Sequence, residues 1–238
     1  SVCLNVGCIP SKSLLHTAQI INEAKHANEL GISFGDTKID IDGVRKSKES
    51  IVNKLTAGIQ ALAKARKVKV VMGHAKFLSK NQVGLEGTDE VIEFEHCIIA
   101  AGSRVTKMPM FPFNDERVMD STDALMMDDI PKRLLVVGGG IIGLEMATIY
   151  DALGSEITIV ELGGQIIPAS DKDIVSPLLK RIKKNYANIF LNTKVTKMTA
   201  SKKGIKVIFE GKDAPKTDTF DKVLVAVGRS PNGQMIGA

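Results

Sequence analysis

The sequence contains few cysteines, only Cys3, Cys8 and Cys97 among 238 residues. Three cysteines cannot build a disulfide framework, and their scarcity is typical of a reducing compartment, where structural disulfides are rare. The chain also lacks any apolar run near the roughly 20 residues that cross a bilayer, and it lacks a charged-then-apolar signal segment. We therefore expect a cytoplasmic protein without a membrane partner.

Aromatic residues are scarce as well, at 4% of the chain with no tryptophan, although the net charge is +5. Nucleic-acid binding would combine such charge with aromatic side chains or a recognisable module, so we expect no nucleic-acid partner. Much of the positive charge lies between Arg45 and Lys69. Apolar residues recur there at helical spacing, which predicts an amphipathic helix whose lysines face solvent. These residues are Val44, Ile51, Val52, Leu55, Ile59 and Leu62.

Two of the cysteines lie close together, because only four residues separate Cys3 from Cys8 in CLNVGCIPSK. They could be a structural staple, two metal ligands or a redox-active pair. A structural zinc site needs four ligands, commonly two close pairs, whereas the sequence offers one pair and four scattered histidines. The redox-active pair is favoured and no metal is expected. Cys97 lies in the apolar stretch VIEFEHCIIAAG, and we expect it to be a buried, unreactive thiol.

Helices precede strands in the first part of the sequence. Residues 10–31 show a helical pattern that ends at Gly31, a residue suited to a C-cap. Composition then predicts short strands at 68–73, 75–79, 82–87 and 91–102. Residues 103–118 combine prolines with no periodicity, which indicates a crossover between two domains.

A glycine-rich turn between a strand and a helix marks the second part. RLLVV (133–137) precedes GGGIIG (138–143), a helical run to Gly154 and the strand EITIVE (156–161), which together predict a βαβ unit. The motif G-x-G-x-x-G allows a tight turn, close approach to a pyrophosphate and close packing of the helix. The pyrophosphate binds at the N-terminus of the helix, where free N–H groups favour negative charge.

An acidic residue about 20 positions after the glycines is expected to bind the ribose 2′-hydroxyl of the nucleotide. Glu161, at the end of the second strand, fits this role. A carboxylate there repels a 2′-phosphate, and the following residues 162–164 contain no arginine to neutralise one. The sequence therefore favours NAD over NADP.

The remaining sequence predicts one helix and several strands. The helix lies between Asp171 and Asn185, and Pro177 either stands in its first turn after Ser176 as N-cap or kinks it. Strands are predicted at 188–192, 194–201, 204–211 and 221–228, the middle two as a hairpin.

The cysteine pair followed by the glycine fingerprint resembles the pyridine nucleotide-disulfide oxidoreductases. CLNVGCIPSK and GGGIIGLE are most similar to the dihydrolipoamide dehydrogenase branch, as are IIAAGS, IIPASDKDI and LVAVGRSPN. The resemblance covers essentially the whole chain. It implies an α/β fold in which a Rossmann-like NAD-binding domain, a parallel sheet flanked by helices plus a β-meander, follows part of an FAD-binding domain. The expected boundaries are 1–105 for the partial FAD-binding domain, 106–232 for the NAD-binding domain and 233–238 for a connection back to the former.

The resemblance also implies roles for individual residues. Cys3 is implied to exchange with the substrate and Cys8 to face the flavin, while Lys12 lies beside the flavin and pairs with Glu145. The residues implied to contact FAD are Lys12, Gly73, Ala101, Gly102 and Ser103. The residues implied to contact NAD are Gly138, Gly139, Gly140, Ile141, Ile142, Gly143, Glu145, Glu161, Val195 and Gly228.

The implied activity is oxidation of dihydrolipoamide to lipoamide with NAD as acceptor and FAD as the intermediate carrier. The implied partners are the lipoyl group of a 2-oxoacid dehydrogenase acyltransferase and a second copy in a homodimer. Family members carry a first glycine fingerprint before the cysteines and a catalytic His–Glu pair near the C-terminus. Neither is found here, so we expect a fragment that is inactive alone. The alternatives are a non-catalytic NAD-binding module and a related reductase for glutathione or mercuric ion.

Overall fold

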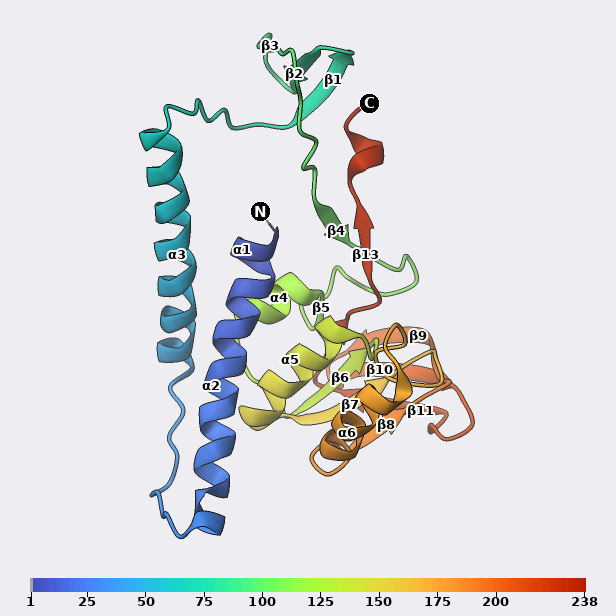
Figure 1. The fold of residues 1–238 in the computed structure, drawn as a ribbon. Coiled ribbons are helices and arrows are strands. Elements are labelled where there is room, and N and C mark those ends of the chain that lie inside the picture. The colour runs from blue at the N-terminus through green and yellow to red at the C-terminus, as the bar shows by residue number, and fades with distance from the viewer. Residues whose placement is uncertain (1) are drawn as a thin grey trace.

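The structure is a computed structural model that describes residues 2–238. Its two longest helices stand in the first part of the chain, and strands and shorter helices alternate in the second (Figure 1). The α-helices are α1 Val2–Val6, α2 Cys8–His26, α3 Ile41–Ala65, α4 Ser121–Met126, α5 Ile141–Ala152 and α6 Lys172–Ile182. Two 3-10 helices are η1 Ala27–Leu30 and η2 Gly233–Met235. Within residues 2–238, no helix is long and apolar enough to cross a membrane.

A five-stranded parallel sheet forms the centre of the second part, in the order β5-β12-β6-β7-β8. Its strands are β5 Val118–Met119, β6 Arg133–Val137, β7 Glu156–Val160, β8 Asn188–Phe190 and β12 Lys222–Val225. Helix α5 connects the adjacent parallel strands β6 and β7, which confirms the βαβ unit predicted from the glycine motif. The α/β class with a parallel sheet is therefore confirmed.

Alternation along the central strand β6 gives the sheet two buried faces. Leu134 and Val136 belong to a core shared with α4, α5 and α6, whereas Leu135 and Val137 belong to a second core on the opposite face. Successive side chains of a strand point to opposite faces, so a continuous apolar run such as RLLVV fits a sheet covered on both sides. The helices cover one face and a small antiparallel sheet covers the other.

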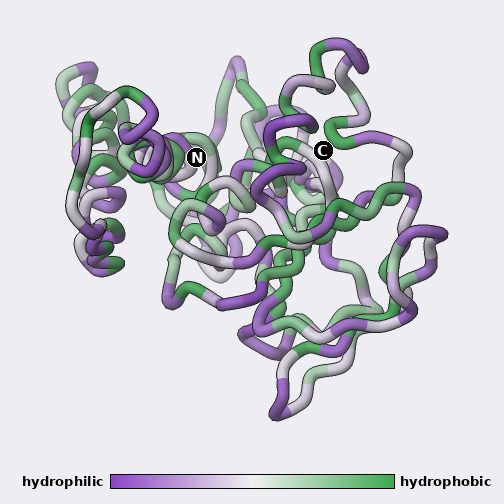
Figure 2. Tube along the Cα trace, turned by 90° about the horizontal axis from the view of Figure 1, so that it is seen from below, coloured by the Kyte–Doolittle hydropathy of each residue, from purple (hydrophilic) through white to green (hydrophobic). Residues whose placement is uncertain are grey.

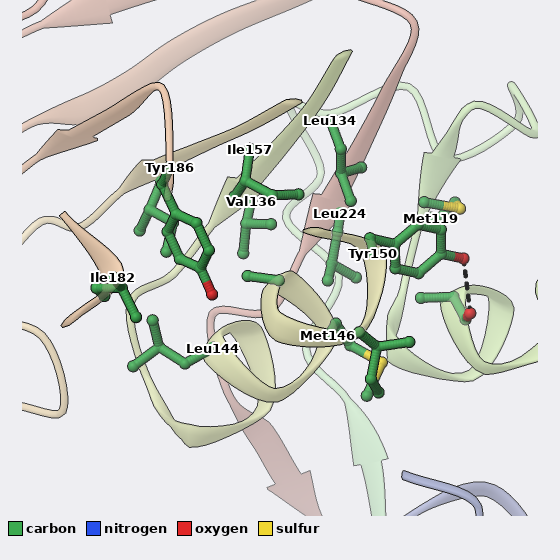
Figure 3. Close-up of a cluster of buried hydrophobic side chains, with 14 of the residues drawn as sticks. Met119, Leu134, Val136, Leu144, Met146, Tyr150, Ile157, Ile182, Tyr186 and Leu224 are labelled. Carbon is green, nitrogen blue, oxygen red and sulfur yellow. Dashed lines mark hydrogen bonds between the residues drawn. The ribbon is translucent and has the colours of Figure 1, made fainter. Parts of the chain in front are cut away.

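The helix-side core is shown in Figure 3, where Val136, Ile157 and Leu224 of the sheet face Leu144 and Met146 of α5. Tyr150 of α5 is also buried there, and its hydroxyl donates a hydrogen bond to the carbonyl oxygen of Ala124 at 2.8 Å. Burial raises the pKa of Tyr150 above its ordinary value. This hydrogen bond satisfies the one polar atom of a large buried side chain and docks α4 onto α5.

The antiparallel sheet on the other face has the order β11-β10-β9, and it is the β-meander that the family resemblance implied. Its strands are β9 Lys194–Ser201, β10 Gly204–Glu210 and β11 Thr217–Phe220. The hairpin of β9 and β10 was predicted from the sequence, whereas β11 was not. Its sequence TDTF carries one large apolar residue, Phe220, which is buried.

Helix α2 joins the first part of the chain to the sheet by packing on α5. The side chains of Leu14, Ala18 and Ile21 are buried on this helix, as its periodicity predicted. The helical turn ends at Gly31, whose φ of +79° is a left-handed conformation that glycine adopts without strain.

Helix α3 corrects one prediction. Its apolar residues were expected to face inward, yet Ile51, Leu55, Ile59 and Leu62 are 41–57% exposed. The side of α3 that meets the neighbouring elements carries Lys48 instead, which is buried and donates a hydrogen bond to the carbonyl oxygen of Leu125 at 2.8 Å. Desolvation lowers the pKa of Lys48. In Figure 2, hydrophobic and hydrophilic residues alternate along the helices at the left edge, as expected for amphipathic helices.

The predicted strands of the first part are only partly correct. A small antiparallel sheet contains β1 Ala75–Ser79, β2 Gln82–Leu85 and β3 Val91–Glu93. Residues 68–73 are not a strand, and the strand predicted at 91–102 ends at Glu93. Cys97 is consequently exposed, as is Ile98 at 95%, so the expectation of a buried core thiol was wrong. Apolar composition predicted burial, but no strand of the described residues pairs with this segment.

The position of Pro177 in helix α6 decides between the two interpretations of the sequence. The helix begins at Lys172 after Asp171 and runs to Ile182, so Pro177 lies inside it rather than in its first turn. Val175 and Ile182 are buried in the helix-side core.

Two short strands connect the upper and lower parts of the molecule in Figure 1. They are β4 Ser103–Val105 and β13 Arg229–Pro231, and they pair with each other in antiparallel register. The chain passes through β4 toward the parallel sheet and returns through β13, beyond which the carbonyl oxygen of Ile236 accepts a hydrogen bond from the Phe77 N–H of β1.

Candidate functional site

A cavity of about 650 Å³ opens at the carboxyl ends of β6, β7 and β12, and we call it the nucleotide cavity. Ligands of open α/β sheets bind at this edge, because the loops that follow the strands converge there. The cavity is lined by residues of six segments. They include Gly138, Gly140, Ile141, Ile142, Glu161, Val195 and Gly228 of the predicted NAD contacts, together with Thr193, Lys194, Ala226 and Val227.

The glycine loop before α5 contains three motif glycines with different surroundings. Gly138 has φ +109°, and a Cβ there would collide with the carbonyl oxygen of Ala226. A Cβ on Gly143 would collide with the carbonyl oxygen of Gly138, so this residue lets α5 pack on the turn. A Cβ on Gly140 would meet no protein atom within 4 Å. The open position at Gly140, at the N-terminus of α5, is the place where a pyrophosphate fits.

Glu161 lies at the end of β7 and faces the glycine loop. Its Oε2 accepts a hydrogen bond from the Gly139 N–H at 2.7 Å, and its Oε1 accepts one from the Gly163 N–H at 2.7 Å. These two bonds hold the carboxylate at the wall of the nucleotide cavity. A carboxylate oxygen has two lone pairs, so each oxygen retains an acceptor position for a ribose hydroxyl.

The two cysteines of the predicted redox pair stand at the start of the chain, Cys3 in α1 and Cys8 at the first position of α2. Both are exposed free thiols. A side-chain hydrogen bond between Cys3 and Cys8 raises the pKa of Cys3, and Lys12 opposes this shift by its positive charge. Gly7 permits the close approach of the two helices, because a Cβ there would lie 2.9 Å from the carbonyl oxygen of Val2.

Lys12 connects this thiol pair to the second part of the molecule. Its Nζ lies 2.6 Å from Oε1 of Glu145, which stands one turn into α5 from the nucleotide cavity. The ion pair implied by the resemblance is thus confirmed. The Lys12 side chain is 62% exposed and that of Glu145 is 22% exposed, so the pair is accessible beside the thiols.

The other residues implied to contact FAD divide into two places. Ala101, Gly102 and Ser103, which lead into β4 and which we call the 101–103 loop, approach the start of α1, since a Cβ on Gly102 would be 3.9 Å from Cγ2 of Val2. Gly73 stands in the link before β1, with Leu85 of β2 as its neighbour. The structure therefore brings the 101–103 loop to the start of α1, whereas Gly73 lies in the link before the small β1–β3 sheet.

Sequence reasoning missed part of the cavity wall. The apolar residues that it did not assign come from the proline-containing segment before β5 and from the turn after β7. They are Met108, Met110, Phe111, Leu162, Ile167, Pro168 and Ala169. The segment 103–118 was interpreted only as a crossover, and its cluster of methionine and phenylalanine near prolines was the signal that it lines a surface.

Comparisons with known proteins agree with this geometry. A family model described as pyridine nucleotide-disulphide oxidoreductase matches residues 1–237. Among curated proteins, a dihydrolipoyl dehydrogenase of Vibrio cholerae is 52% identical over 100% of this chain and 50% of its own length. A dihydrolipoyl dehydrogenase of Bacillus subtilis is 41% identical over 99% of this chain and 51% of its own. The chain thus spans about half the length of these curated relatives.

Among solved structures, the HOCl-induced flavoprotein disulfide reductase RclA from Escherichia coli superposes with a TM-score of 0.79. It is 27% identical and covers 97% of this chain and 48% of its own. Its Cu(II) complex gives the same TM-score, with 98% of this chain and 49% of that chain covered. The likeness extends over both the parallel sheet and the helices that carry the thiol pair.

Proposed function

The chain belongs to the pyridine nucleotide-disulphide oxidoreductase family, and we propose that it oxidises a dihydrolipoyl substrate at Cys3 and Cys8 with NAD as the final acceptor. The observation that carries this proposal is the Lys12–Glu145 ion pair, which joins the helix of the thiol pair to the helix that opens the nucleotide cavity. The substrate class follows from the curated dihydrolipoyl dehydrogenases that are 52% and 51% identical to this chain.

The residues around the nucleotide cavity fit NAD. The open space at Gly140 receives a pyrophosphate at the N-terminus of α5, and Glu161 retains acceptor positions for a ribose hydroxyl. The same carboxylate disfavours a 2′-phosphate by charge repulsion, which supports NAD rather than NADP. Val195 and Gly228 line the cavity from the strands beyond.

For FAD, we propose contacts with Lys12, the 101–103 loop and Gly73. The support is the position of Lys12 one turn after Cys8 on α2 and the approach of Gly102 to Val2, the residue before Cys3. Bound FAD would supply a two-electron carrier between the dithiol and NAD. The corresponding parts of the chain would be residues 1–105 for flavin binding, 106–232 for NAD binding and 233–238 for the return to the first part.

The chemistry of the cysteines can be written with its electrons balanced. In the oxidised enzyme, a substrate thiolate attacks the sulfur of Cys3, and the S–S bond breaks with Cys8 leaving as a thiolate. The second substrate thiol, after losing its proton, attacks the mixed disulfide and releases Cys3. The substrate gains a disulfide, and the enzyme pair gains two electrons and one or two protons. Cys3 and Cys8 return to the disulfide when these electrons pass to NAD⁺.

The groups around Cys3 support its proposed role as the thiol that exchanges with the substrate. The hydrogen bond between Cys3 and Cys8 raises the pKa of Cys3, while the positive charge of Lys12 lowers it and so favours the thiolate. The groups that shift the pKa of Cys3 are Cys8 and Lys12, and among the described residues no histidine contributes to this shift. We propose that the base that removes the substrate proton is none of His16, His26, His74 and His96, because none of them matches the catalytic histidine that the family resemblance implies.

We also propose the cellular setting and partners. Cys3, Cys8 and Cys97 are free thiols, which suits a reducing cytoplasm. The macromolecular partners would be the lipoyl group of a 2-oxoacid dehydrogenase acyltransferase and a second copy of the protein. The chain alone is expected to bind NADH without sustaining turnover, since it spans half the length of its relatives.

Stoichiometric thiol exchange tests the proposal without requiring turnover. The chain is oxidised with diamide, separated from the reagent and mixed with dihydrolipoamide, and the lipoamide released is quantified. NADH binding is measured separately by titration. We expect about one lipoamide per chain, none from Cys3→Ser or Cys8→Ser, and saturable NADH binding in all three. NADH binding without lipoamide formation would favour the non-catalytic module. Exchange with glutathione in place of dihydrolipoamide would favour the related reductase.

A further inference from the structure

The connecting strands β4 and β13 carry side-chain hydrogen bonds that the proposed reaction leaves unexplained. In their antiparallel register, Ser103 lies opposite Pro231 and Val105 lies opposite Arg229. The two strands lie between the small β1–β3 sheet and the part of the molecule that carries the nucleotide cavity (Figure 1). A contact that spans them can therefore transmit a displacement from one part to the other.

Arg229 makes such a contact with both polar groups of Ser103. Its Nε donates to the Ser103 hydroxyl oxygen at 2.8 Å, and its Nη2 donates to the Ser103 carbonyl oxygen at 2.7 Å. A guanidinium presents its donors as a rigid planar fork, so the two bonds fix the backbone and the side chain of Ser103 together. Because the hydroxyl oxygen already accepts a bond from Arg229, its own proton remains available for donation to another group.

Asn232, the residue that follows β13, holds the rest of the 101–103 loop. The side-chain amide of Asn232 donates to the carbonyl oxygen of Ala101 at 3.0 Å, and its backbone N–H donates to the carbonyl oxygen of Gly102 at 3.0 Å. All three residues of the loop are thus bonded to residues 229–232, which gives this loop its position.

The other end of the same segment forms part of the nucleotide cavity. Residues 226–228 line the cavity immediately before Arg229, and the Gly228 carbonyl oxygen accepts a hydrogen bond from the Thr106 N–H at 3.1 Å. Gly228 has φ +125°, and a Cβ there would meet no atom within 4 Å. Gly228 directly precedes Arg229 in the chain, so a nucleotide that contacts Gly228 can shift the backbone of Arg229.

We infer that Arg229 is a positioning residue that couples occupation of the nucleotide cavity to the position of Ser103 in the 101–103 loop. The inference rests on the proposed function, because it takes the cavity as the NAD site. Arg229 touches neither substrate nor nucleotide in this scheme, and it acts through Ser103. Since coupling between two sites is reciprocal, a group bound at the 101–103 loop would change NADH affinity by the same factor.

Hydrogen exchange of the whole chain, measured by mass spectrometry with and without NADH, tests the coupling. In the unmodified chain, we expect NADH to slow exchange of the amides in peptides covering residues 101–106 by at least about 5-fold, the lower end of typical coupling factors. Arg229→Lys keeps the charge but loses the fork, and Arg229→Met loses both. In either variant, we expect NADH affinity to change less than about 3-fold while the NADH-dependent slowing disappears.

Arg104→Met is the matched control on the opposite strand. Arg104 donates to the side chain of Asn232 and to the Pro231 carbonyl oxygen. Neither of these hydrogen bonds involves Ser103. This variant should retain the slowing. If the unmodified chain binds NADH and residues 101–106 show no slowing, or if both Arg229 variants retain it, the coupling role is refuted while the proposed function stands. If the unmodified chain does not bind NADH, the proposed function fails and this inference with it.

Discussion

Lys12 and Glu145 form an ion pair in which Nζ lies 2.6 Å from Oε1, although the two residues are 133 positions apart. Lys12 stands one turn after Cys8 on α2, and Glu145 stands one turn after the glycine loop on α5. The pair therefore bridges the helix that begins at Cys8 and the helix that follows the glycine loop. The two side chains meet only because α2 packs against α5.

The first prediction concerns the strength of this pair. Because Lys12 is largely exposed, we expect a coupling energy of only about 0.2–1 kcal/mol in a double-mutant cycle of Lys12→Met and Glu145→Gln. Urea unfolding of the four proteins measures it. A coupling of several kcal/mol would mean that the pair is shielded from water far more than its exposure indicates.

The second prediction concerns the pKa of Cys3. Cys8→Ala removes the hydrogen bond that is the largest cause of the raised pKa, so the pKa of Cys3 should fall toward 9.0. Lys12→Met removes a charge that lowers the pKa, so the pKa of Cys3 should rise further. Alkylation by iodoacetamide as a function of pH, followed by peptide mass spectrometry, gives both shifts. Cys97 in the same samples is the internal control, and shifts of the same sign in both variants would contradict the contact described here.

The third prediction separates two glycines of one motif. Gly143→Ala should destabilise the fold by roughly 1–3 kcal/mol, because its Cβ would collide with the Gly138 carbonyl oxygen. Gly140→Ala should leave stability within about 0.5 kcal/mol, since its Cβ meets no protein atom. The same variant should weaken NADH binding at least about 10-fold by filling the space for the pyrophosphate. Thermal unfolding and calorimetric titration distinguish the two, and unchanged NADH affinity in Gly140→Ala would remove this loop from the site.

The fourth prediction tests cofactor selection by Glu161. Glu161→Arg should weaken NADH binding and improve NADPH binding, since an arginine can pair with a 2′-phosphate. Glu161 also accepts bonds from Gly139 and Gly163, so Glu161→Gln serves as the control that keeps an acceptor oxygen without the charge. Titration of both nucleotides into each variant gives the preference. An unaltered NADH-to-NADPH ratio in Glu161→Arg would exclude Glu161 from ribose recognition.

The fifth prediction concerns acid stability. The guanidinium of Arg117 lowers the pKa of Asp115 from 3.8 to about 2, and Arg117 also donates to the Ser201 carbonyl oxygen of the meander. A carboxyl with a depressed folded-state pKa contributes stability that is present above pH 3.8 and is lost as the pH falls through 2. Asp115→Asn should therefore reduce the loss of stability between these pH values. Urea unfolding at pH 2–5 measures it, with Asp213→Asn, at an exposed position, as the control. An equal loss in both variants would count against the Asp115–Arg117 pair.

Local patterns in the sequence determined much of the second part of the molecule. Gly138, Gly140 and Gly143 act within one turn and one helix, and RLLVV alternates between two cores because strand side chains alternate between faces. The position of Glu161 followed from the length of a βαβ unit. Each of these features depends on backbone geometry within about 30 residues, so composition and spacing suffice to predict it.

Tertiary structure alone decided which apolar residues are buried and which distant polar groups meet. The buried ammonium group of Lys48 donates a hydrogen bond to the carbonyl oxygen of Leu125, which lies 77 positions away. Ile59 and Cys97 are exposed, because no element among the described residues covers their segments. The fork from Arg229 to Ser103 likewise joins residues 126 positions apart. Periodicity reports which faces of a helix or strand are apolar, but only the packed chain determines what lies against each face.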